Sequence, residues 1–168
     1  MEPTRDVRMT RLFERHYAEV LAYCARRIGR SDADDAAAEV FATAWRRIDE
    51  VDWSTVKPWL YGISRHVVAN RWRSFRRWTR LTRKVSGLAR GRADSPESVI
   101  MQRDEDLQVR RALRRLSATD QEVLRLAAWE ELTAGEIGQV MQISASAAEK
   151  TASEGLGPAG PDPRTPDQ

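Results

Sequence analysis

The segment from Lys57 to Lys84 contains the residues whose types and spacing best suit binding chemistry. Its 28 residues include nine Lys and Arg and no acid, and five aromatic residues lie between these cations: Trp59, Tyr61, Trp72, Phe75 and Trp78. Basic side chains release counterions from phosphates, and aromatic rings stack on unpaired bases. The segment is therefore typical of a helix that binds single-stranded or melting nucleic acid.

Part of this segment also has a purely structural interpretation. Trp59, Leu60, Ile63 and Val67 are three and four residues apart, which predicts a stripe that packs in a core. The cations fit that interpretation less well, because nine like charges without a compensating acid repel one another. We expect the apolar stripe to be core and the arginines to face an anionic partner.

The remaining sequence offers little for catalysis or metal binding. A single cysteine, Cys24, excludes a disulfide framework within the chain, and one cysteine with only two histidines, His16 and His66, spread along the sequence does not favour a metal site. We find no glycine-rich phosphate loop and no nucleophile with a recognisable base. We therefore expect no enzymatic activity, no cofactor and no metal. Because Cys24 falls on an apolar stripe, it is predicted to be a small buried hydrophobe.

Composition and charge narrow the class of protein. The chain has 168 residues, of which 41% are hydrophobic and 32% charged, as in soluble helix-rich proteins. No run of about 18 apolar residues and no secretory signal is visible, so a cytoplasmic protein is expected. Residues 1–90 hold 19 Lys and Arg against 11 Asp and Glu, whereas residues 91–168 hold 9 against 14. This asymmetry favours an anionic partner for the first half.

Helical periodicity predicts an all-α fold. In the first half, apolar spacing predicts a helix over residues 12–28 that ends at Gly29, and Ser31 or Asp32 is predicted to cap a second helix. Residues 49–57 are predicted to form a loop, and Pro58 fits the first turn of a long third helix.

The second half predicts a smaller helical domain. Residues 99–116 form an amphipathic pattern, Ser117 with Asp120 and Thr133 with Glu136 are capping pairs, and a turn at residues 143–144 precedes a helix from Ala145. Two short helices around a tight turn make a helix-turn-helix candidate. The predicted domains are residues 1–85, a flexible linker over 86–98, residues 99–154, and a disordered tail over 155–168.

Two stretches carry a family resemblance. DADDAAAEVFATAWRRI followed by PWLYGISRHVVANRWRSFRR resembles region 2 of the sigma-70 family of bacterial transcription initiation factors. LSATDQEVLRLAAWEELTAGEIGQVMQIS resembles region 4. The resemblance covers residues 11–150 and is greatest to the short extracytoplasmic-function group, which keeps only these two regions. It implies a dissociable subunit that binds core RNA polymerase and promoter DNA, and it makes an anti-sigma factor a candidate partner.

The resemblance also assigns roles to residues. On the acidic helix that docks on the largest polymerase subunit, the matching residues are Asp35, Glu39, Phe41 and Trp45. The acids at its start also fit a plain helix N-terminus. The loop over 49–57 and the next helix would open the −10 element and hold a flipped base. The residues implied there are Arg65, His66, Asn70, Arg71, Arg73, Arg76, Arg77 and Arg80. Ser144, Ser146 and Lys150 would contact the −35 element.

The resemblance fails after Lys150. The family continues with basic residues, but this chain has TASEGLGP. Glu154 would repel phosphate, and Gly155, Gly157 and Pro158 are predicted to stop the helix early. Recognition of the −35 element is therefore expected to be weak or absent. A frameshifted or truncated gene end and genuine divergence both explain the change. The alternatives are a degenerate sigma-like interaction protein and a polymerase-independent helix-turn-helix regulator.

Overall fold

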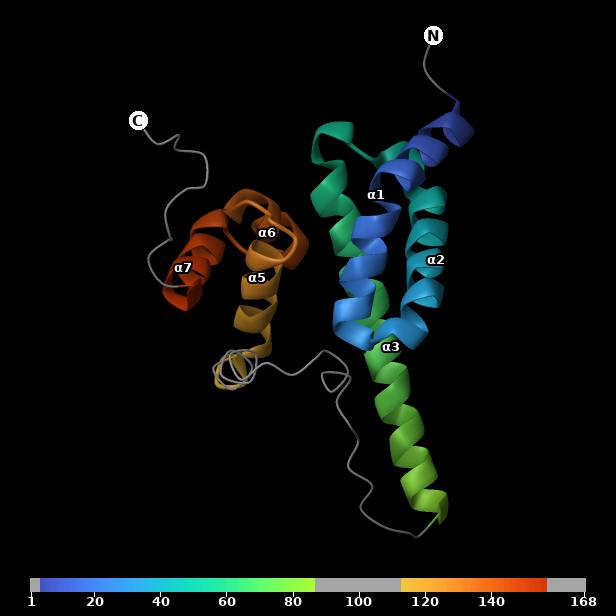
Figure 1. Cartoon of the computed structure of the whole chain (residues 1–168), viewed down its shortest axis with the longest axis vertical. Helices are drawn as coiled ribbons and strands as arrows, with labels where there is room; N and C mark the ends of the chain where they lie inside the picture. The colour runs from blue at the N-terminus through green and yellow to red at the C-terminus, as the bar shows by residue number, and fades with distance from the viewer. Residues whose placement is uncertain (1–3, 87–112, 157–168) are drawn as a thin grey trace, which may run out of the picture. The chain divides into compact units, whose positions relative to one another are not determined.

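The computed structural model describes residues 4–86 and 113–156, and every regular element within them is a helix (Figure 1). These residues belong to two compact units, which confirms the predicted all-α class with two small helical domains. The predicted linker over 86–98 and the predicted tail over 155–168 lie almost wholly outside the described residues, so the predicted domain boundaries stay predictions. None of the described helices is long and apolar enough to cross a membrane.

The first unit contains three α helices and two short 3-10 helices. They are α1 (Arg5–Ile28), α2 (Arg30–Arg47), η1 (Ile48–Glu50), η2 (Trp53–Thr55) and α3 (Val56–Ser86). Buried alanines on α2, among them Ala36, Ala37 and Ala44, let α1 and α3 approach it closely. Tyr23 of α1 and Tyr61 of α3 meet in this core as a tilted ring pair with centroids 5.4 Å apart. The unit is thus held by burial of small and aromatic side chains between the three helices.

Gly29 joins α1 to α2 and confirms the predicted end of the first helix. Its φ of 85° suits glycine, and its N–H donates to the carbonyl of Ala25. The prediction that Ser31 or Asp32 caps the second helix is wrong, because α2 begins at Arg30 without a side-chain cap. The abrupt turn at Gly29 leaves no extended residue for a cap, so both residues lie in the first turn.

Two predicted boundaries in the first unit also differ from the structure. The first helix begins at Arg5 rather than near residue 12. Its first two turns lack apolar periodicity, but Arg5 and Arg8 contact residues 45–49 and so stabilise these turns. The predicted loop contains η1 and η2, and its last two residues already belong to α3. Pro58 lies in the first turn of α3, as predicted.

Burial on α3 is confined to its first half. The residues predicted to pack, Leu60, Ile63 and Val67, are all buried, and Trp59 is half-buried. The last buried side chain of the helix is Val68, among residues whose burial is described up to Thr82. Figure 1 shows the second half of α3 extending beyond the ends of α1 and α2. This half of the helix is therefore supported by backbone hydrogen bonds rather than by a core.

The second unit contains α5 (Ala118–Ala128), α6 (Ala134–Met141) and α7 (Ala145–Leu156). Both predicted capping pairs are present: the side chain of Ser117 accepts from the N–H of Asp120, and Thr133 with Glu136 forms a complete capping box. The predicted turn between α6 and α7 is also confirmed, with Gln142 in the left-handed conformation. The predicted helix over 99–116 lies mostly outside the described residues.

Of the three residues predicted to stop the last helix, Gly155 does not, because α7 continues through it to Leu156, whereas Gly157 and Pro158 lie outside the described residues. A Cβ at Gly155 would lie 2.5 Å from Cδ2 of Leu124 on α5, so α7 approaches α5 closely at this point. One turn earlier, Thr151 donates a hydrogen bond to Oδ1 of Asp120. Packing on α5 thus outweighs the low helix propensity of glycine.

The capping box of α6 allows a test of this local structure. Thr133→Ala removes the acceptor for the N–H of Glu136 and should lower the free energy of unfolding of the second unit by about 1 kcal/mol. Urea denaturation followed by circular dichroism measures the change. Thr119→Ala, at an exposed position on α5, is the matched control and should change stability by less than about 0.5 kcal/mol. Equal effects of the two substitutions would contradict the capping assignment.

Candidate nucleic-acid interface

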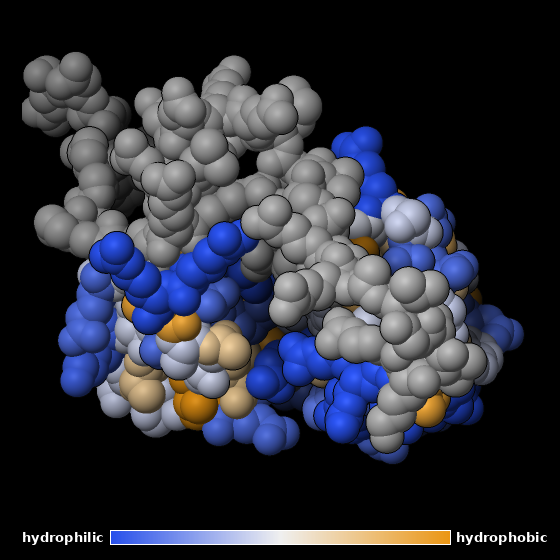
Figure 2. Space-filling view, turned by 90° about the horizontal axis from the view of Figure 1, so that it is seen from below, coloured by the Kyte–Doolittle hydropathy of each residue, from blue (hydrophilic) through white to orange (hydrophobic). Residues whose placement is uncertain are grey.

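The projecting half of α3 has a cationic face. Arg73, Arg76, Arg77 and Arg80 follow the spacing of one helix face, and all four are exposed. The aromatic residues predicted to interleave with them lie on the opposite side of the helix, where Phe75 is 48% and Trp78 64% exposed. Figure 2, which looks at the molecule from the end toward which α3 projects, shows a surface that is mainly hydrophilic. Four cations and two accessible rings thus occur together without a packing role.

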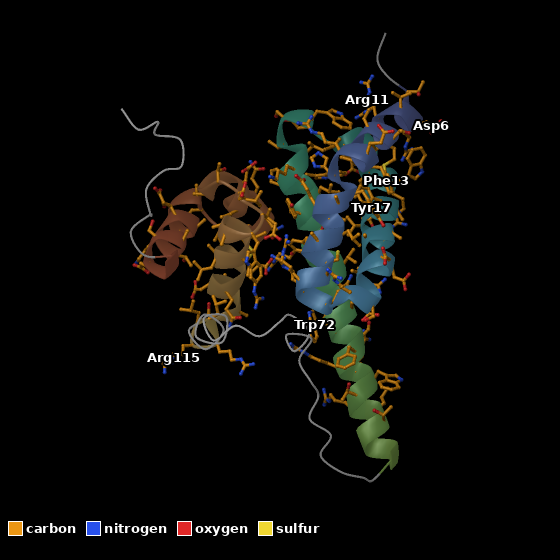
Figure 3. The ribbon with its side chains drawn as sticks, viewed as in Figure 1. Asp6, Arg11, Phe13, Tyr17, Trp72 and Arg115 are labelled. Carbon is orange, nitrogen blue, oxygen red and sulfur yellow. The ribbon has the colours of Figure 1, made fainter. Side chains whose placement is uncertain are left out.

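Trp72 marks the point where the helix leaves the core (Figure 3). Its ring is half-buried and meets the ring of Phe75 edge-on at 6.3 Å. This contact aligns two of the aromatic side chains along the helix.

The predicted −10 residues nearest the core are not all free. Arg71 is only partly exposed and forms an ion pair with Glu39 of α2, with Nη2 3.2 Å from Oε2. Arg73 donates a hydrogen bond to Oδ1 of Asn70. His66 is exposed and Arg65 half-buried. The ion pair therefore connects a residue predicted to bind polymerase with one predicted to bind DNA.

The predicted docking residues on α2 divide by burial. Asp35, Glu39 and Trp45 are exposed, but Phe41 is 4% exposed and packs beneath the surface instead of contributing to it. The ring of Phe41 meets that of Phe13 at 5.0 Å. Phe41 thus supports this surface from the core side.

Two residues of α1 extend the same surface. Phe13 and Tyr17, labelled in Figure 3, lie beside Phe41, and their own ring centroids are 4.6 Å apart. Sequence periodicity predicts both in a buried stripe, but Phe13 is exposed and Tyr17 half-buried. They lie at the edge of the apolar stripe, where the helical period alone does not tell whether a side chain is buried or exposed.

The sequence did not reveal a cluster at the start of α1. Arg5 and Arg8 both contact Asp49, at 3.5 Å each. The guanidinium of Arg5 also lies 4.8 Å from the ring centroid of Trp45, and that of Arg8 lies 5.3 Å from the centroid of Trp53. These contacts join residues about 40 positions apart, so no local spacing could have indicated them. They fasten the first turns of α1 to the loop after α2.

The loop itself has a fixed turn. Oδ1 of Asp52 accepts hydrogen bonds from the hydroxyl of Ser54 at 2.7 Å and from its backbone N–H at 2.9 Å. The side-chain bond first, and the backbone bond second, lower the pKa of the Asp52 carboxyl, which remains ionised. This turn places Trp53 at the exposed tip of the loop.

The residues predicted to read the −35 element lie at the start of α7 and along it. The hydroxyl of Ser144 accepts from the N–H of Ala147 and so caps the helix, while Ser146 is exposed. Lys150 is the one cation of α7, and its Nζ is 4.0 Å from Oε1 of Glu154. With Glu149 also exposed, the outer face of α7 carries more negative than positive charge.

No other chemistry emerges from the described residues. Burial raises the pKa of the Cys24 thiol to about 11, so the prediction of an inert buried cysteine is confirmed. Within residues 4–86 and 113–156, no three His, Cys, Asp or Glu side chains are grouped so that they could hold a metal ion.

Comparison with known families gives two matches in the order of the chain. Residues 12–79 match the model of sigma-70 region 2, and residues 106–156 match that of sigma-70, region 4. Together they cover more than two thirds of the chain.

Individual proteins are also similar. The RNA polymerase sigma factor YlaC of Bacillus subtilis is 29% identical over 139 residues, which are 80% of each chain. The RNA polymerase sigma factor NccH of Alcaligenes xylosoxydans is 28% identical over 149 residues, 82% of this chain and 77% of NccH. The solved sigma factor RpoE of Bartonella quintana, bound to the anti-sigma factor NepR, aligns with a TM-score of 0.63 at 18% identity. That alignment covers 91% of this chain and 93% of RpoE. CnrH, solved with the cytosolic domain of CnrY, aligns with a TM-score of 0.54 at 22% identity, over 88% of this chain and 84% of CnrH.

Proposed function

Because the chain belongs to the sigma-70 family, in its extracytoplasmic-function group, and is a sigma factor for transcription initiation, we propose that its first unit performs the two essential tasks. These tasks are docking on core RNA polymerase and opening of the −10 element. The observation that carries the proposal is the unpacked half of α3, in which four exposed arginines lie on one face and exposed aromatic rings on the other.

Docking is assigned to the exposed surface formed by α1 and α2. Asp35 and Glu39 supply negative charge, and Trp45, Phe13 and Tyr17 supply apolar area. Aromatic residues surrounded by charge are typical of protein interfaces. Glu39 is already paired with Arg71, so Asp35 is the acid more readily available to a cationic partner.

The docking assignment predicts a strong effect at Asp35. Asp35→Arg should weaken binding to core polymerase by roughly tenfold or more, because a like charge replaces an attractive one. Titration of labelled protein with core enzyme measures the affinity, and circular dichroism checks that helicity is kept. Glu149→Arg, which makes the same charge change at an exposed position on α7 in the second unit, is the control. Unchanged affinity in Asp35→Arg would refute the assignment.

Opening of the −10 element is assigned to α3 and the loop before it. Separating a base from its stack costs a few kcal/mol, which aromatic stacking and phosphate contacts offset. Phe75 and Trp78 provide accessible rings, and Arg73, Arg76, Arg77 and Arg80 provide cations for the adjacent phosphates. Arg71, held by Glu39, positions the start of this helix rather than reaching outward.

Salt dependence tests the arginine assignment. Arg73→Ala with Arg76→Ala removes two phosphate contacts, so the slope of log K against log salt for single-stranded −10 DNA should become shallower by about 1.4. Equilibrium binding by the holoenzyme at four salt concentrations measures the slope. Arg11→Ala with Arg15→Ala removes the same charge from exposed positions on α1. If both double variants have the slope of the wild type, the arginines are only a solvated face.

Recognition of the −35 element is proposed to be weak. The single cation on α7 lies beside Glu154, and negative charge on a helix that enters the major groove repels phosphate. The protein would then depend on the −10 element and on polymerase for its position at a promoter.

This proposal predicts little duplex binding by the second unit. A fragment of residues 95–168 should bind duplex DNA no better than nonspecifically, with Kd on the order of 10⁻⁴ to 10⁻⁶ M at physiological salt. Glu154→Arg should make the salt slope steeper by about 0.9, and Glu131→Arg, outside α7, should change it less. Nanomolar binding of the wild-type fragment to a specific −35 duplex would contradict the proposal.

The remaining assignments follow from the family. The protein performs no bond chemistry, since polymerase synthesises the RNA, and it acts in the cytoplasm. An anti-sigma factor is a candidate partner, because the related RpoE was solved with one.

A further inference from the structure

The side of α3 that lies opposite its arginines carries an exposed apolar row. Phe75, Trp78 and Leu81 are three residues apart, and Leu81, at 61% exposed, is nearly as accessible as Trp78. Steps of three residues turn each side chain by about 60° from the last, so the row covers about a third of the helix circumference. This half of α3 extends beyond the ends of α1 and α2, so neither of these helices covers the row (Figure 1).

Two threonines widen this row without making it polar. The hydroxyl of Thr79 donates to the carbonyl of Phe75 at 2.9 Å, and that of Thr82 donates to the carbonyl of Trp78 at 3.1 Å. Both hydroxyls are thus satisfied by the backbone of their own helix. Together with the row they form an apolar face that can leave water without stranding the polar atoms of these threonines.

The other side of the same helix is strongly cationic. Its four exposed arginines are not balanced by any acid, because residues 57–84 contain no Asp or Glu. A helix with arginines on one side and Trp, Phe and Leu on the other is typical of helices that lie in the surface of an anionic membrane. Arginine side chains are long enough to reach lipid headgroups while the opposite face enters the acyl boundary.

We propose that the projecting half of α3 binds the surface of an anionic phospholipid membrane. The helix lies flat, with Phe75, Trp78 and Leu81 at the boundary between headgroups and acyl chains and the arginines among the headgroup phosphates. An indole suits this boundary because its ring is apolar and its N–H is polar. This site goes beyond the proposed function and uses some of the same side chains, so membrane and −10 DNA exclude each other.

Leu81 favours a lipid over a nucleic acid as the occupant of the apolar face. Bases stack on aromatic rings and phosphates pair with cations, but an aliphatic side chain does neither. Leu81 nevertheless continues the row formed by the two rings. An acyl layer takes all three side chains at once, and its anionic headgroups match the charge of the arginines.

Vesicle binding tests the proposal with the full chain. The protein should float with vesicles of phosphatidylglycerol and phosphatidylcholine, and should bind pure phosphatidylcholine vesicles at least about tenfold more weakly. Leu81→Gln should weaken binding to the anionic vesicles by about tenfold, because it removes apolar area from the acyl boundary. The same variant should leave the affinity of the holoenzyme for single-stranded −10 DNA unchanged. Val7→Gln, at an exposed position on α1, is the matched control for both measurements.

Insertion is measured separately by tryptophan fluorescence. Anionic vesicles with brominated acyl chains should quench the protein, since bromine quenches indoles that reach the acyl layer. Trp78→Phe should remove most of this quenching while vesicle binding is kept. Trp129→Phe, at an exposed position in the second unit, should leave the quenching unchanged. Circular dichroism checks that each variant keeps its helicity.

Equal binding to anionic and uncharged vesicles overturns the proposal. Wild-type vesicle affinity in Leu81→Gln, or quenching that does not depend on Trp78, also overturns it, because the chain is then only adsorbed by charge. Holoenzyme bound to single-stranded −10 DNA should not float with the vesicles, and flotation of that complex would refute the mutual exclusion. A chain that binds vesicles as expected but opens no promoter with active core polymerase overturns the proposed function and not the membrane site.

Discussion

Among the residues whose burial is described, Val68 is the last buried side chain of α3, and the rest of the first unit depends on this limit of the core. Up to that residue, α3 packs on α1 and α2 through Leu60, Tyr61 and Val67, and its side chains are committed to the core. Beyond it, the helix has no packing neighbour among the described residues of the unit and presents cations and rings to solvent. Exposed aromatic residues and uncompensated charge are unfavourable in an isolated helix. They are suited to binding a nucleic acid, whose phosphates are negative and whose bases can stack on aromatic rings.

The contacts that hold this core also place its two surfaces. The ion pair of Glu39 with Arg71 connects α2 to α3, while Arg5 and Arg8 connect α1 to the loop between α2 and α3. The proposed docking and DNA-binding surfaces are therefore joined by an ion pair. The second unit differs, because its last helix is stabilised by packing on α5 although its outer face has become acidic.

Local chemistry explains which features could be predicted from the sequence. The capping pairs at Ser117 and Thr133 and the turn at Gly29 depend on neighbouring residues, so they were predicted correctly. The helix that continues through Gly155 was missed because its stability comes from Leu124, thirty-one residues away.

The same distinction holds for the candidate site. The cationic run of α3 is visible in the sequence because charge accumulates along it. The approach of Arg8 to Trp53 is not, since it depends on how three helices pack. The burial of Phe41 and the pairing of Arg71 also follow from tertiary packing alone.

The central claim is that this sigma factor positions polymerase mainly through the −10 element. Selection of opened promoters from random duplex DNA by the holoenzyme tests it most directly, with opened DNA recovered by reactivity of its unpaired thymines. The account predicts one enriched motif at −10 with little sequence preference near −35. A strong −35 motif, or no enrichment with active core enzyme, would contradict it.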